Sequence, residues 1–135
     1  MEWTGFEPRA PEPVDAAIQV TSEEQAGPGR RPGLKLLARM GEDQVGECIL
    51  IPSGNGQGPP AWEDRLFVYW LGIEDAWQGK RLGVHLLQRG LNDAHKLGYR
   101  RAGINTNWTN HRAFAFYTNF GFSVLDWTYD WHRTL

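Results

Sequence analysis

Two periods of hydrophobic residues run along this chain and predict where its strands and helices lie. Residues 34–51 carry two apolar-rich runs on either side of a polar, glycine-containing turn at 41–44, which is typical of a β-hairpin. Residues 65–73 (RLFVYWLGI) are rich in aromatic and β-branched side chains and are apolar on both faces. We expect them to form a central strand that is covered on both sides.

The longest helical pattern covers Lys80 to Leu97. Its apolar side chains return at three- and four-residue spacings and share one stripe, formed by Leu82, Leu86, Leu87, Leu91, Ala94 and Leu97. Gly98 stands where a glycine commonly ends a helix, and residues 99–106 then predict a further strand. The pattern therefore indicates a strand–helix–strand unit.

A second, shorter helix is predicted from His111 to Asn119. Asn110 precedes it as a capping residue, and Gly121 follows it. One face of this helix is apolar and consists of Ala113, Phe116, Tyr117 and Phe120. Residues 122–131 predict a last strand, in which alternate aromatic residues lie on one side for core or dimer packing.

The N-terminal part of the chain has a different character. Residues 1–33 are rich in proline and hold few large apolar residues, so we expect them to add little to the core. Residues 14–26 fit either one strand or one short helix, while glycine and proline predict a turn at 27–33 and a loop at 53–64. We therefore divide the chain into a proline- and glycine-rich segment, 1–33, and a domain, 34–135.

The predicted elements follow the order strand, strand, loop, strand, helix, strand, helix, strand. Strand–helix–strand units join parallel strands by right-handed crossovers, whereas the leading hairpin is antiparallel. The expected fold class is therefore α/β, with a mixed, partly parallel sheet flanked by helices.

Composition narrows the classes of protein to consider. The chain has 135 residues, of which 41% are hydrophobic and 22% charged, which fits one globular domain and excludes wholesale disorder or a coiled coil. No apolar run reaches the roughly 18–20 residues that span a bilayer, and the first residues lack the basic and apolar regions of a signal peptide. The single cysteine, Cys48, has no partner for an internal disulfide, so we expect a cytoplasmic protein.

Charge is distributed unevenly along the chain. Residues 1–64 carry 11 acidic and 5 basic side chains, whereas residues 65–135 carry 5 acidic and 9 basic ones. The net charge of -2 gives no support for nucleic-acid binding. The basic second part fits either an anionic ligand or a solvated helix surface.

The segment Ile73 to Gly83 (IEDAWQGKRLG) is the main candidate for an anion site, because a strand ends there and a helix begins. Backbone N–H groups at a helix N-terminus carry partial positive charge, and the two glycines let the backbone approach a ligand closely. Lys80 and Arg81 add two cations, which favours a phosphate or diphosphate. The spacing is neither that of a Walker loop nor that of a dinucleotide fingerprint. An ordinary strand–helix turn with surface cations is the alternative.

Other reactive side chains carry weaker signals. The four histidines show no ligand spacing, so we expect no metal. Cys48 has no basic partner nearby in the sequence, so we expect a buried strand residue and not a nucleophile. The acidic residues that flank the central strand are Glu63, Asp64, Glu74 and Asp75. Each fits either a general base that acts through water or a solvated surface carboxylate.

Two motifs, separated by one helix and one strand, carry a family resemblance. The first is Gln78-Gly79-Lys80-Arg81-Leu82-Gly83. The second has its characteristic residues at Asn110, Ala113, Tyr117, Gly121 and Phe122. Together they resemble the diphosphate loop Q/R-x-x-G-x-G/A and the later signature N-x-x-A-x-x-x-Y-x-x-x-G-F of the GCN5-related N-acetyltransferases (GNAT). The resemblance covers about residues 35–135.

This resemblance implies an activity and a site. Family members transfer an acetyl group from acetyl-CoA to an amine in one direct step, so acetyl-CoA as acyl donor and an amine-bearing acceptor, a small molecule or a peptide, are implied. Tyr117 matches the tyrosine that protonates the leaving thiolate, although a packed core tyrosine is the alternative. The residues implied to bind the donor are Leu71, Ile73, Gln78, Gly79, Lys80, Arg81, Leu82, Gly83 and Asn110. Asn110 fits a simple helix cap equally well.

One position departs from the family's loop. Arg81 stands where the family has its first glycine. If this position needs a positive φ, an arginine costs roughly 1 kcal/mol or more. If it needs only helical dihedral angles, the guanidinium can reach a phosphate itself. We favour the helical conformation.

The front of the domain also looks abbreviated. The family usually places a strand and one or two helices before the hairpin, where much of the acceptor site forms, and here only residues 1–33 precede it. A homodimer is the expected source of the missing surface. The short front and Arg81 also fit a second class of function, a CoA-binding or interaction module of the same fold with weak catalysis.

Overall fold

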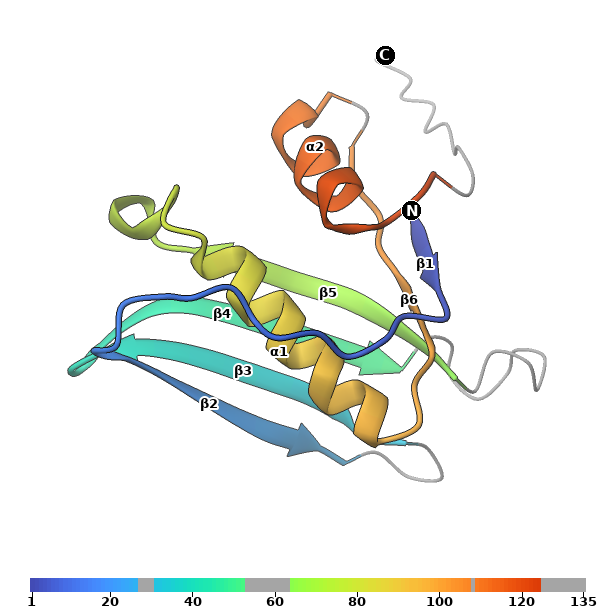
Figure 1. Ribbon diagram of the computed structural model, residues 1–135, viewed down its shortest axis with the longest axis horizontal. Helices are drawn as coiled ribbons and strands as arrows, with labels where there is room; N and C mark the ends of the chain where they lie inside the picture. Colours follow the sequence, from blue (N-terminus) through green and yellow to red (C-terminus); the bar gives the residue numbers. More distant parts are fainter. Residues whose placement is uncertain (27–30, 53–63, 108, 125–135) are drawn as a thin grey trace, which may run out of the picture.

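The computed structural model describes residues 1–26, 31–52, 64–107 and 109–124. In this part of the chain, strands form one six-stranded sheet in the order β1-β6-β5-β4-β3-β2 (Figure 1). The strands are β1 (Glu2–Thr4), β2 (Ile18–Gln25), β3 (Gly33–Met40), β4 (Asp43–Pro52), β5 (Arg65–Ile73) and β6 (Arg101–Gly103). The helices are a 3-10 turn (Asp75–Trp77), α1 (Leu82–Lys96) and α2 (His111–Phe120).

The sheet is mixed, as predicted. β5 and β6, which α1 connects, are parallel, and the other neighbouring pairs are antiparallel. β3 and β4 form the predicted hairpin, and β2 pairs with β3 along its whole length, so residues 18–25 are a strand and not a helix. The expected fold class, α/β with a partly parallel sheet, is confirmed.

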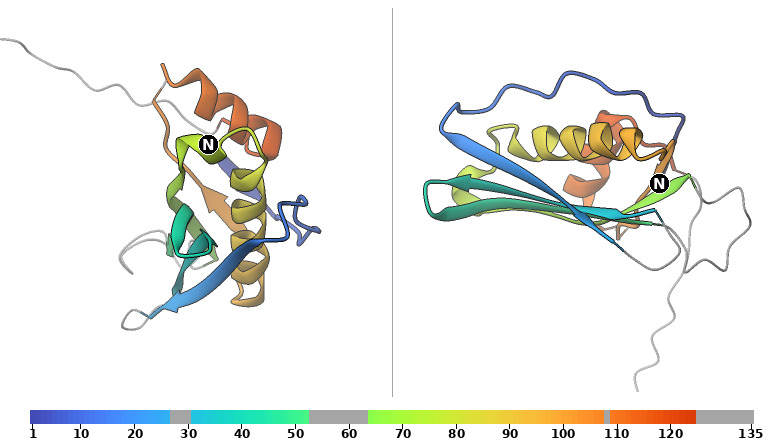
Figure 2. Two further views of the ribbon diagram at one scale, coloured as in Figure 1. Left: turned by 90° about the vertical axis from the view of Figure 1, so that its left-hand side faces the viewer. Right: turned by 90° about the horizontal axis from the view of Figure 1, so that it is seen from below.

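Helix α1 lies against one face of the sheet (Figure 2), and its apolar stripe is buried in the core. The buried residues of this stripe are Leu82, Leu86, Leu87, Leu91 and Ala94, as the sequence pattern predicts. Gly90 lets the helix approach closely, because a Cβ atom there would lie 2.8 Å from the Leu50 side chain of β4. The core therefore sits between α1 and the middle strands.

The expectation that β5 is covered on both sides is wrong. Leu66 and Val68 are buried, but Tyr69 and Trp70 expose 62% and 54% of their surface to solvent. A register shift against β4 pairs Ile49 with Trp70 and Leu50 with Val68, so Tyr69 is an extra residue in the ladder. The prediction failed because both faces of β5 carry apolar residues, whereas the single crossover helix covers only one face.

The expectation that residues 1–33 add little to the core is also wrong. Phe6 is only 1% exposed, and Trp3 packs against Phe6, Phe120 and Phe122 with ring centroids 5.7–6.1 Å apart. β1 joins the sheet beside β6, where the Glu2 carboxylate lies 3.3 Å from the Arg65 guanidinium. β2, which lies in the segment 1–33, pairs with β3, which begins at Gly33. The domain boundary after residue 33 stays a prediction.

Between β1 and β2 the chain crosses α1 on the side away from the sheet (Figure 2). We call residues 7–13 of this crossing the strap. Its main anchor is Arg9, whose backbone N–H donates to Asn92 Oδ1 at 3.1 Å and whose carbonyl accepts from Asn92 Nδ2 at 2.7 Å. The proline-rich composition suits this extended path, since proline disfavours helix and sheet interiors.

Of the remaining predicted elements, one strand is shorter than expected, and one loop and the last strand lie mostly outside the described residues. The strand expected at 99–106 is limited to β6, and Ser123 forms an isolated bridge to Glu2 at the start of the expected last strand. Most of the loop at 53–64 and of that last strand lies outside the described residues. No helix in the described ranges is long and apolar enough to cross a membrane.

Candidate functional site

The site begins where β5 and β6 separate. The two strands pair only at Arg65–Phe67 of β5, although β5 continues to Ile73. The Glu74 N–H donates to the Val45 carbonyl at 3.0 Å, so by the alternation of antiparallel strands the backbone groups of Leu71 and Ile73 point away from β4. These groups therefore face the gap between the separated strands.

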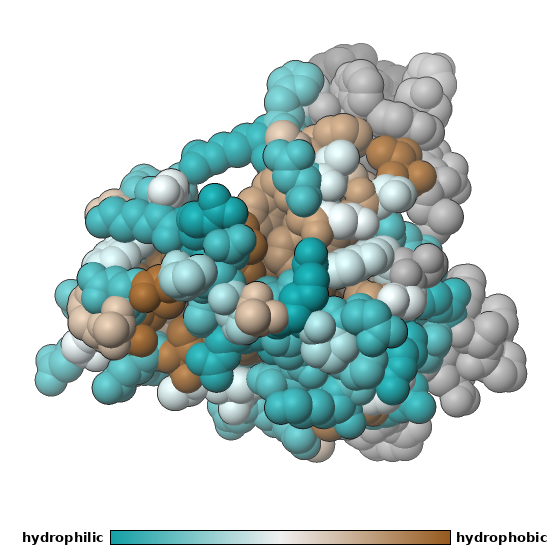
Figure 3. All heavy atoms as spheres, viewed as in Figure 1, coloured by the Kyte–Doolittle hydropathy of each residue, from teal (hydrophilic) through white to brown (hydrophobic). Residues whose placement is uncertain are grey.

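A cavity of about 890 Å³ lies beside this gap, between the end of β5, the N-terminus of α1, the helix α2 and the strap. Figure 3 shows this face, with hydrophobic surface in the hollow and hydrophilic side chains around it. The predicted residues that line it are Leu71, Ile73, Gln78, Gly79, Arg81, Leu82, Gly83, Asn110 and Tyr117. The fold thus brings together two motifs that the sequence separates.

Lys80 is the exception among the predicted donor-binding residues. It is not part of the cavity wall, and its Nζ atom lies 4.7 Å from the centroid of the Trp77 ring. An ammonium over an aromatic face is held by the ring quadrupole. Lys80 therefore belongs to the outer surface of the loop, and the structure does not bring it to the cavity.

The loop before α1 is attached to the strand that precedes it. The Gln78 Nε2 atom donates to the Ile73 carbonyl at 3.0 Å and to Asp75 Oδ1 at 3.2 Å. Gly79 follows with a φ of 77°, a conformation that glycine adopts without steric cost. The side-chain amide of Gln78 is thus used to shape the loop, which leaves the backbone to face the cavity.

The helical conformation that we favoured for Arg81 is wrong. Arg81 is the residue before α1 and has φ 63° and ψ 15°, in the left-handed region. The chain turns from the 3-10 segment into α1 through two positive φ angles, at Gly79 and Arg81, which explains why a glycine suits this position. The side chain of Arg81 makes no capping bond to α1, and Leu82 and Gly83, the first residues of this helix, lie in the cavity wall.

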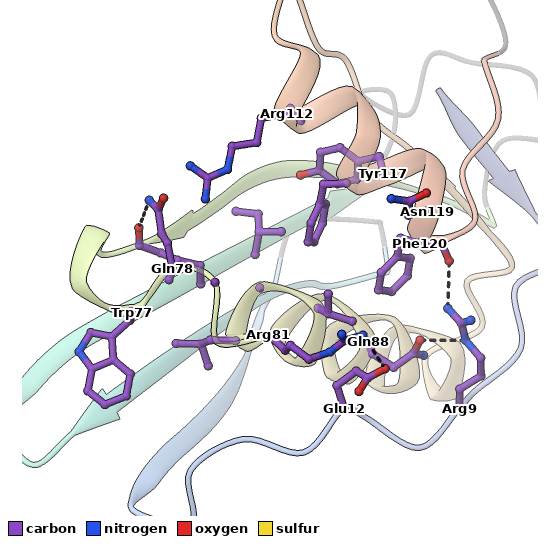
Figure 4. A pocket seen from close by; sticks show the side chains of 18 of the residues that line it. Arg9, Glu12, Trp77, Gln78, Arg81, Gln88, Arg112, Tyr117, Asn119 and Phe120 are labelled. Atoms are coloured by element: carbon purple, nitrogen blue, oxygen red, sulfur yellow. Dashed lines mark hydrogen bonds and ion pairs between the residues drawn. The ribbon is translucent and has the colours of Figure 1, made fainter.

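The side chain of Arg81 has a partner from a distant part of the sequence. Its Nη2 atom lies 3.1 Å from Glu12 Oε1, in an ion pair that crosses from the loop to the strap (Figure 4). The His85 Nδ1 atom lies 2.7 Å from the Glu12 carbonyl oxygen, which fixes the same part of the strap to α1. The guanidinium at the family's glycine position is therefore already engaged with a carboxylate.

Helix α2 carries the second motif, and each motif residue has a local role. The Asn110 side chain accepts a hydrogen bond from the Ala113 N–H at 3.1 Å, so the predicted cap is confirmed. Gly121 ends the helix with a φ of 139°, and the N–H groups of Gly121 and Phe122 donate to the Tyr117 carbonyl at 3.1 and 2.9 Å. The motif thus fixes both ends of the helix that carries Tyr117.

Tyr117 is only 7% exposed, yet it contributes to the cavity wall, and its hydroxyl points into the cavity (Figure 4). Its ring makes edge contacts with Phe116 and Phe122, with centroids 5.0 and 5.6 Å away. Burial, together with the Cys48 thiol nearby, raises the pKa of Tyr117 above its ordinary value of 10.0. The hydroxyl therefore keeps its proton at neutral pH.

Cys48 on β4 is the buried strand residue that the sequence predicted. It is fully enclosed, and burial, followed by the charge of Glu47, raises the pKa of its thiol to about 12. A thiol that stays protonated is a poor nucleophile. Among the described residues, no group of three or more histidine, cysteine or acidic side chains could hold a metal ion.

Of the carboxylates considered as general bases, Asp64, Glu74 and Asp75 are not part of the cavity wall. Asp64 pairs with Arg101 at 2.9 Å, at the opposite end of β5, and Glu74 and Asp75 are exposed beside the loop. Glu63 lies outside the described residues.

Three charged residues of the cavity wall were not predicted from the sequence, namely Arg9, Glu12 and Arg112. Arg112 sits inside the second motif and extends from α2 toward the loop that carries Gln78, so the motif offered a signal for it (Figure 4). Arg9 and Glu12 lie among the prolines of the strap, where no local pattern marked them. Glu12 is the one carboxylate that the described part of the chain contributes to the cavity wall.

Comparison with known proteins identifies the family. The Acetyltransferase (GNAT) family matches residues 2–122, and the chain therefore belongs to the GNAT acetyltransferases. A curated relative, the mycothiol acetyltransferase of Sanguibacter keddieii, is 34% identical over 92 residues. That alignment covers 67% of this chain but only 28% of the relative, so the chain spans less than a third of that protein.

Solved structures show the same fold at low sequence identity. A GNAT family acetyltransferase from Elizabethkingia anophelis, with acetyl-CoA bound, matches with a TM-score of 0.63 and 15% identity over 83% of this chain and 80% of that one. An aminoglycoside acetyltransferase from an uncultured soil metagenomic sample, in complex with trehalose, has a TM-score of 0.62 and 12% identity over 90% and 98% of the two chains. The likeness establishes the fold, which agrees with the resemblance seen in the sequence.

Proposed function

We propose that this protein is an N-acetyltransferase that moves an acetyl group from acetyl-CoA to an amine of a small molecule or peptide. One observation carries the proposal. A single cavity joins the loop Gln78–Gly83, the unpaired end of β5 and the hydroxyl of Tyr117. Membership in the GNAT family and the acetyl-CoA bound to a relative of the same fold support the choice of donor.

The cavity wall offers complementary groups to each part of this donor. Diphosphate would be held by the N–H groups at the start of α1, which no side chain caps, and by the positive end of the helix dipole. Arg9, Arg81 and Arg112 add positive charge to the wall. The pantetheine arm would pair with the backbone of Leu71 and Ile73, which faces away from β4.

The proposed reaction is one direct displacement. The neutral amine nitrogen attacks the thioester carbonyl carbon, the new C–N bond forms, the C–S bond breaks, and the sulfur leaves with the electron pair. Tyr117, which is protonated at neutral pH, donates its proton to the departing thiolate as the amine loses its extra proton to water, and water then returns a proton to the tyrosinate. N–H groups at the unpaired strand end would polarise the carbonyl oxygen during the attack.

The proposal extends to the setting of the enzyme. We expect it to act in the cytoplasm. We also expect it to form a homodimer that completes the acceptor side.

A second function is favoured by one feature of the site. Arg81 adopts a conformation that disfavours non-glycine residues, and its guanidinium is already paired with Glu12. This arrangement suits a module of the same fold that binds CoA weakly or serves as an interaction partner with little catalysis.

Calorimetric titration with acetyl-CoA, followed by a turnover assay, separates the two functions. Binding together with release of free thiol in the presence of a panel of primary amines supports the enzyme, because the reaction frees CoA. Binding without thiol release supports the module. Gly83→Glu is the matched control, since a Cβ atom at Gly83 has only ordinary contacts at 3.6–3.7 Å, while the added carboxylate repels a diphosphate. Absence of binding by the unaltered protein contradicts the acetyl-CoA proposal.

A further inference from the structure

We infer that Glu12 sets the affinity of this site for a diphosphate ligand, because its carboxylate occupies the Arg81 guanidinium until the ligand displaces it. This inference rests on the proposed function, since it concerns the same loop. It assigns a role to the strap, a segment that contributes to the cavity but contains neither of the two motifs.

The strap holds Glu12 in place. Glu12 Oε1 lies 3.1 Å from Arg81 Nη2, and the Glu12 carbonyl oxygen lies 2.7 Å from His85 Nδ1. Three residues earlier in the chain, Arg9 donates from Nε to Gln88 Oε1 at 3.0 Å and from Nη2 to the Phe120 carbonyl at 3.3 Å. The strap is therefore tied to both α1 and α2, and it carries Glu12 to the edge of the cavity.

The charged side chains of the cavity wall place Glu12 in competition with a diphosphate. Arg9, Arg81 and Arg112 contribute to the cavity wall, and among the described lining residues Glu12 is the single carboxylate. A diphosphate bound at the start of α1 carries at least two negative charges and would lie next to the Arg81–Glu12 pair. The carboxylate would repel this ligand and would also compete with it for the guanidinium.

If Glu12 instead positioned the Arg81 guanidinium for the ligand, its removal would weaken ligand binding. The solvent exposure of the two side chains disfavours this role. The side chains of Arg81 and Glu12 are 64% and 40% exposed, so the pair is screened by water and contributes little to stability. A ligand with more charge than one carboxylate can therefore replace Glu12.

The test compares two donors and two variants by calorimetric titration. Acetyl-CoA carries the diphosphate, whereas S-acetylpantetheine carries the same thioester arm without any phosphate. Glu12→Gln removes the charge, and Glu7→Gln is the matched control, because Glu7 lies in the same strap but its side chain is 82% exposed and the residue is not part of the cavity wall. Melting temperatures of all three proteins verify that the fold is kept.

We expect Glu12→Gln to lower the Kd for acetyl-CoA by a factor of about 3 to 10, as expected for removing one like charge at a few ångströms in a high dielectric. The Kd for S-acetylpantetheine stays unchanged, and Glu7→Gln changes neither value. The ratio of the Kd of the unaltered protein to that of Glu12→Gln falls toward one at about 1 M salt, because screening weakens the repulsion.

Three results would overturn the inference. If unaltered protein binds acetyl-CoA and Glu12→Gln binds it equally or more weakly, Glu12 is not a competitor, while the proposed function stands. If Glu12→Gln lowers the Kd for both donors by the same factor, Glu12 limits access to the cavity in general and does not act on the diphosphate subsite. If neither protein binds acetyl-CoA, the inference and the proposed donor fail together.

Discussion

Gln78 and Ile73 are joined by a hydrogen bond in which the Gln78 Nε2 atom donates to the Ile73 carbonyl oxygen at 3.0 Å. This bond links the loop before α1 to the last residue of β5. It matters because the proposed diphosphate subsite lies on the loop and the proposed pantetheine subsite lies on the strand end. The distance between the two subsites is thereby fixed by a side chain that belongs to the first motif.

Loss of this link should weaken donor binding without unfolding the protein. We expect Gln78→Ala to raise the Kd for acetyl-CoA by about 3- to 10-fold, since one hydrogen bond contributes about 0.5–1.5 kcal/mol. Calorimetric titration measures the effect. Asp75→Asn is the control, because it alters the other partner of the Gln78 amide and leaves the bond to Ile73 intact. An unchanged Kd in Gln78→Ala would show that the loop keeps its shape without the bond.

The acid role of Tyr117 predicts a selective loss of turnover. Tyr117→Phe removes the hydroxyl but keeps the ring contacts with Phe116 and Phe122, so the fold should persist. We expect kcat to fall by about 10²-fold with little change in the KM for acetyl-CoA, as for loss of a general acid. Steady-state kinetics of thiol release measures both values. Turnover equal to that of the unaltered protein would leave Tyr117 only a packing role.

The positive φ of Arg81 predicts an unusual order of stabilities. Arg81→Gly and Arg81→Ala both lose the ion pair with Glu12, but only glycine adopts φ 63° without strain. We therefore expect the glycine variant to be more stable than the alanine variant by about 1 kcal/mol. Urea unfolding followed by circular dichroism gives the difference. Equal stabilities, or a more stable alanine variant, would show that this backbone conformation carries no strain.

The cap at Asn110 predicts that the second motif acts partly through helix stability. Asn110→Ala removes the acceptor of the Ala113 N–H, which we expect to lower the free energy of unfolding by about 1 kcal/mol. Asn110→Asp keeps an acceptor at the same place and should be nearly neutral for stability. Urea unfolding of both variants measures these effects, and equal destabilisation would contradict the capping role.

Burial of Cys48 predicts a loss of stability at alkaline pH. The pKa of its thiol rises from 9.0 to about 12 on folding, so between these values the folded protein binds more protons than the unfolded chain. Stability from this group is therefore complete below pH 9 and decreases as pH rises toward 12. At pH 10 the expected loss is on the order of 1 kcal/mol relative to neutral pH.

Cys48→Ala isolates this contribution. The variant should lose about 1 kcal/mol at neutral pH, because it leaves a small cavity, but its stability should depend less on pH between 8 and 10. Urea unfolding at several pH values measures both quantities. Parallel stability curves for the two proteins would show that the thiol ionises as readily in the folded state as in the unfolded chain.

Local patterns were sufficient for much of this fold. The stripe of α1, the cap at Asn110 and the β3–β4 hairpin each depend on residues a few positions apart, and the structure contains all three. Most residues of the two motifs also line the cavity, whereas Lys80 contacts Trp77 and turns outward, and Gly121 and Phe122 are not part of the cavity wall. Coverage of β5 was predicted wrongly, since apolar residues alone do not show whether another element packs on them.

By itself, the sequence determined the order of elements from β3 to α2 and the two motifs that line the cavity, because hydrophobic periodicity and capping act over one or two helical turns. The tertiary structure alone decided that Arg81 has a left-handed backbone, that Phe6 joins the core, and that Glu12 meets a guanidinium 69 positions away. These features depend on contacts between distant segments, which form when the strap crosses α1. No local pattern encodes such a contact, since its free energy comes from packing and charge that exist only in the folded chain.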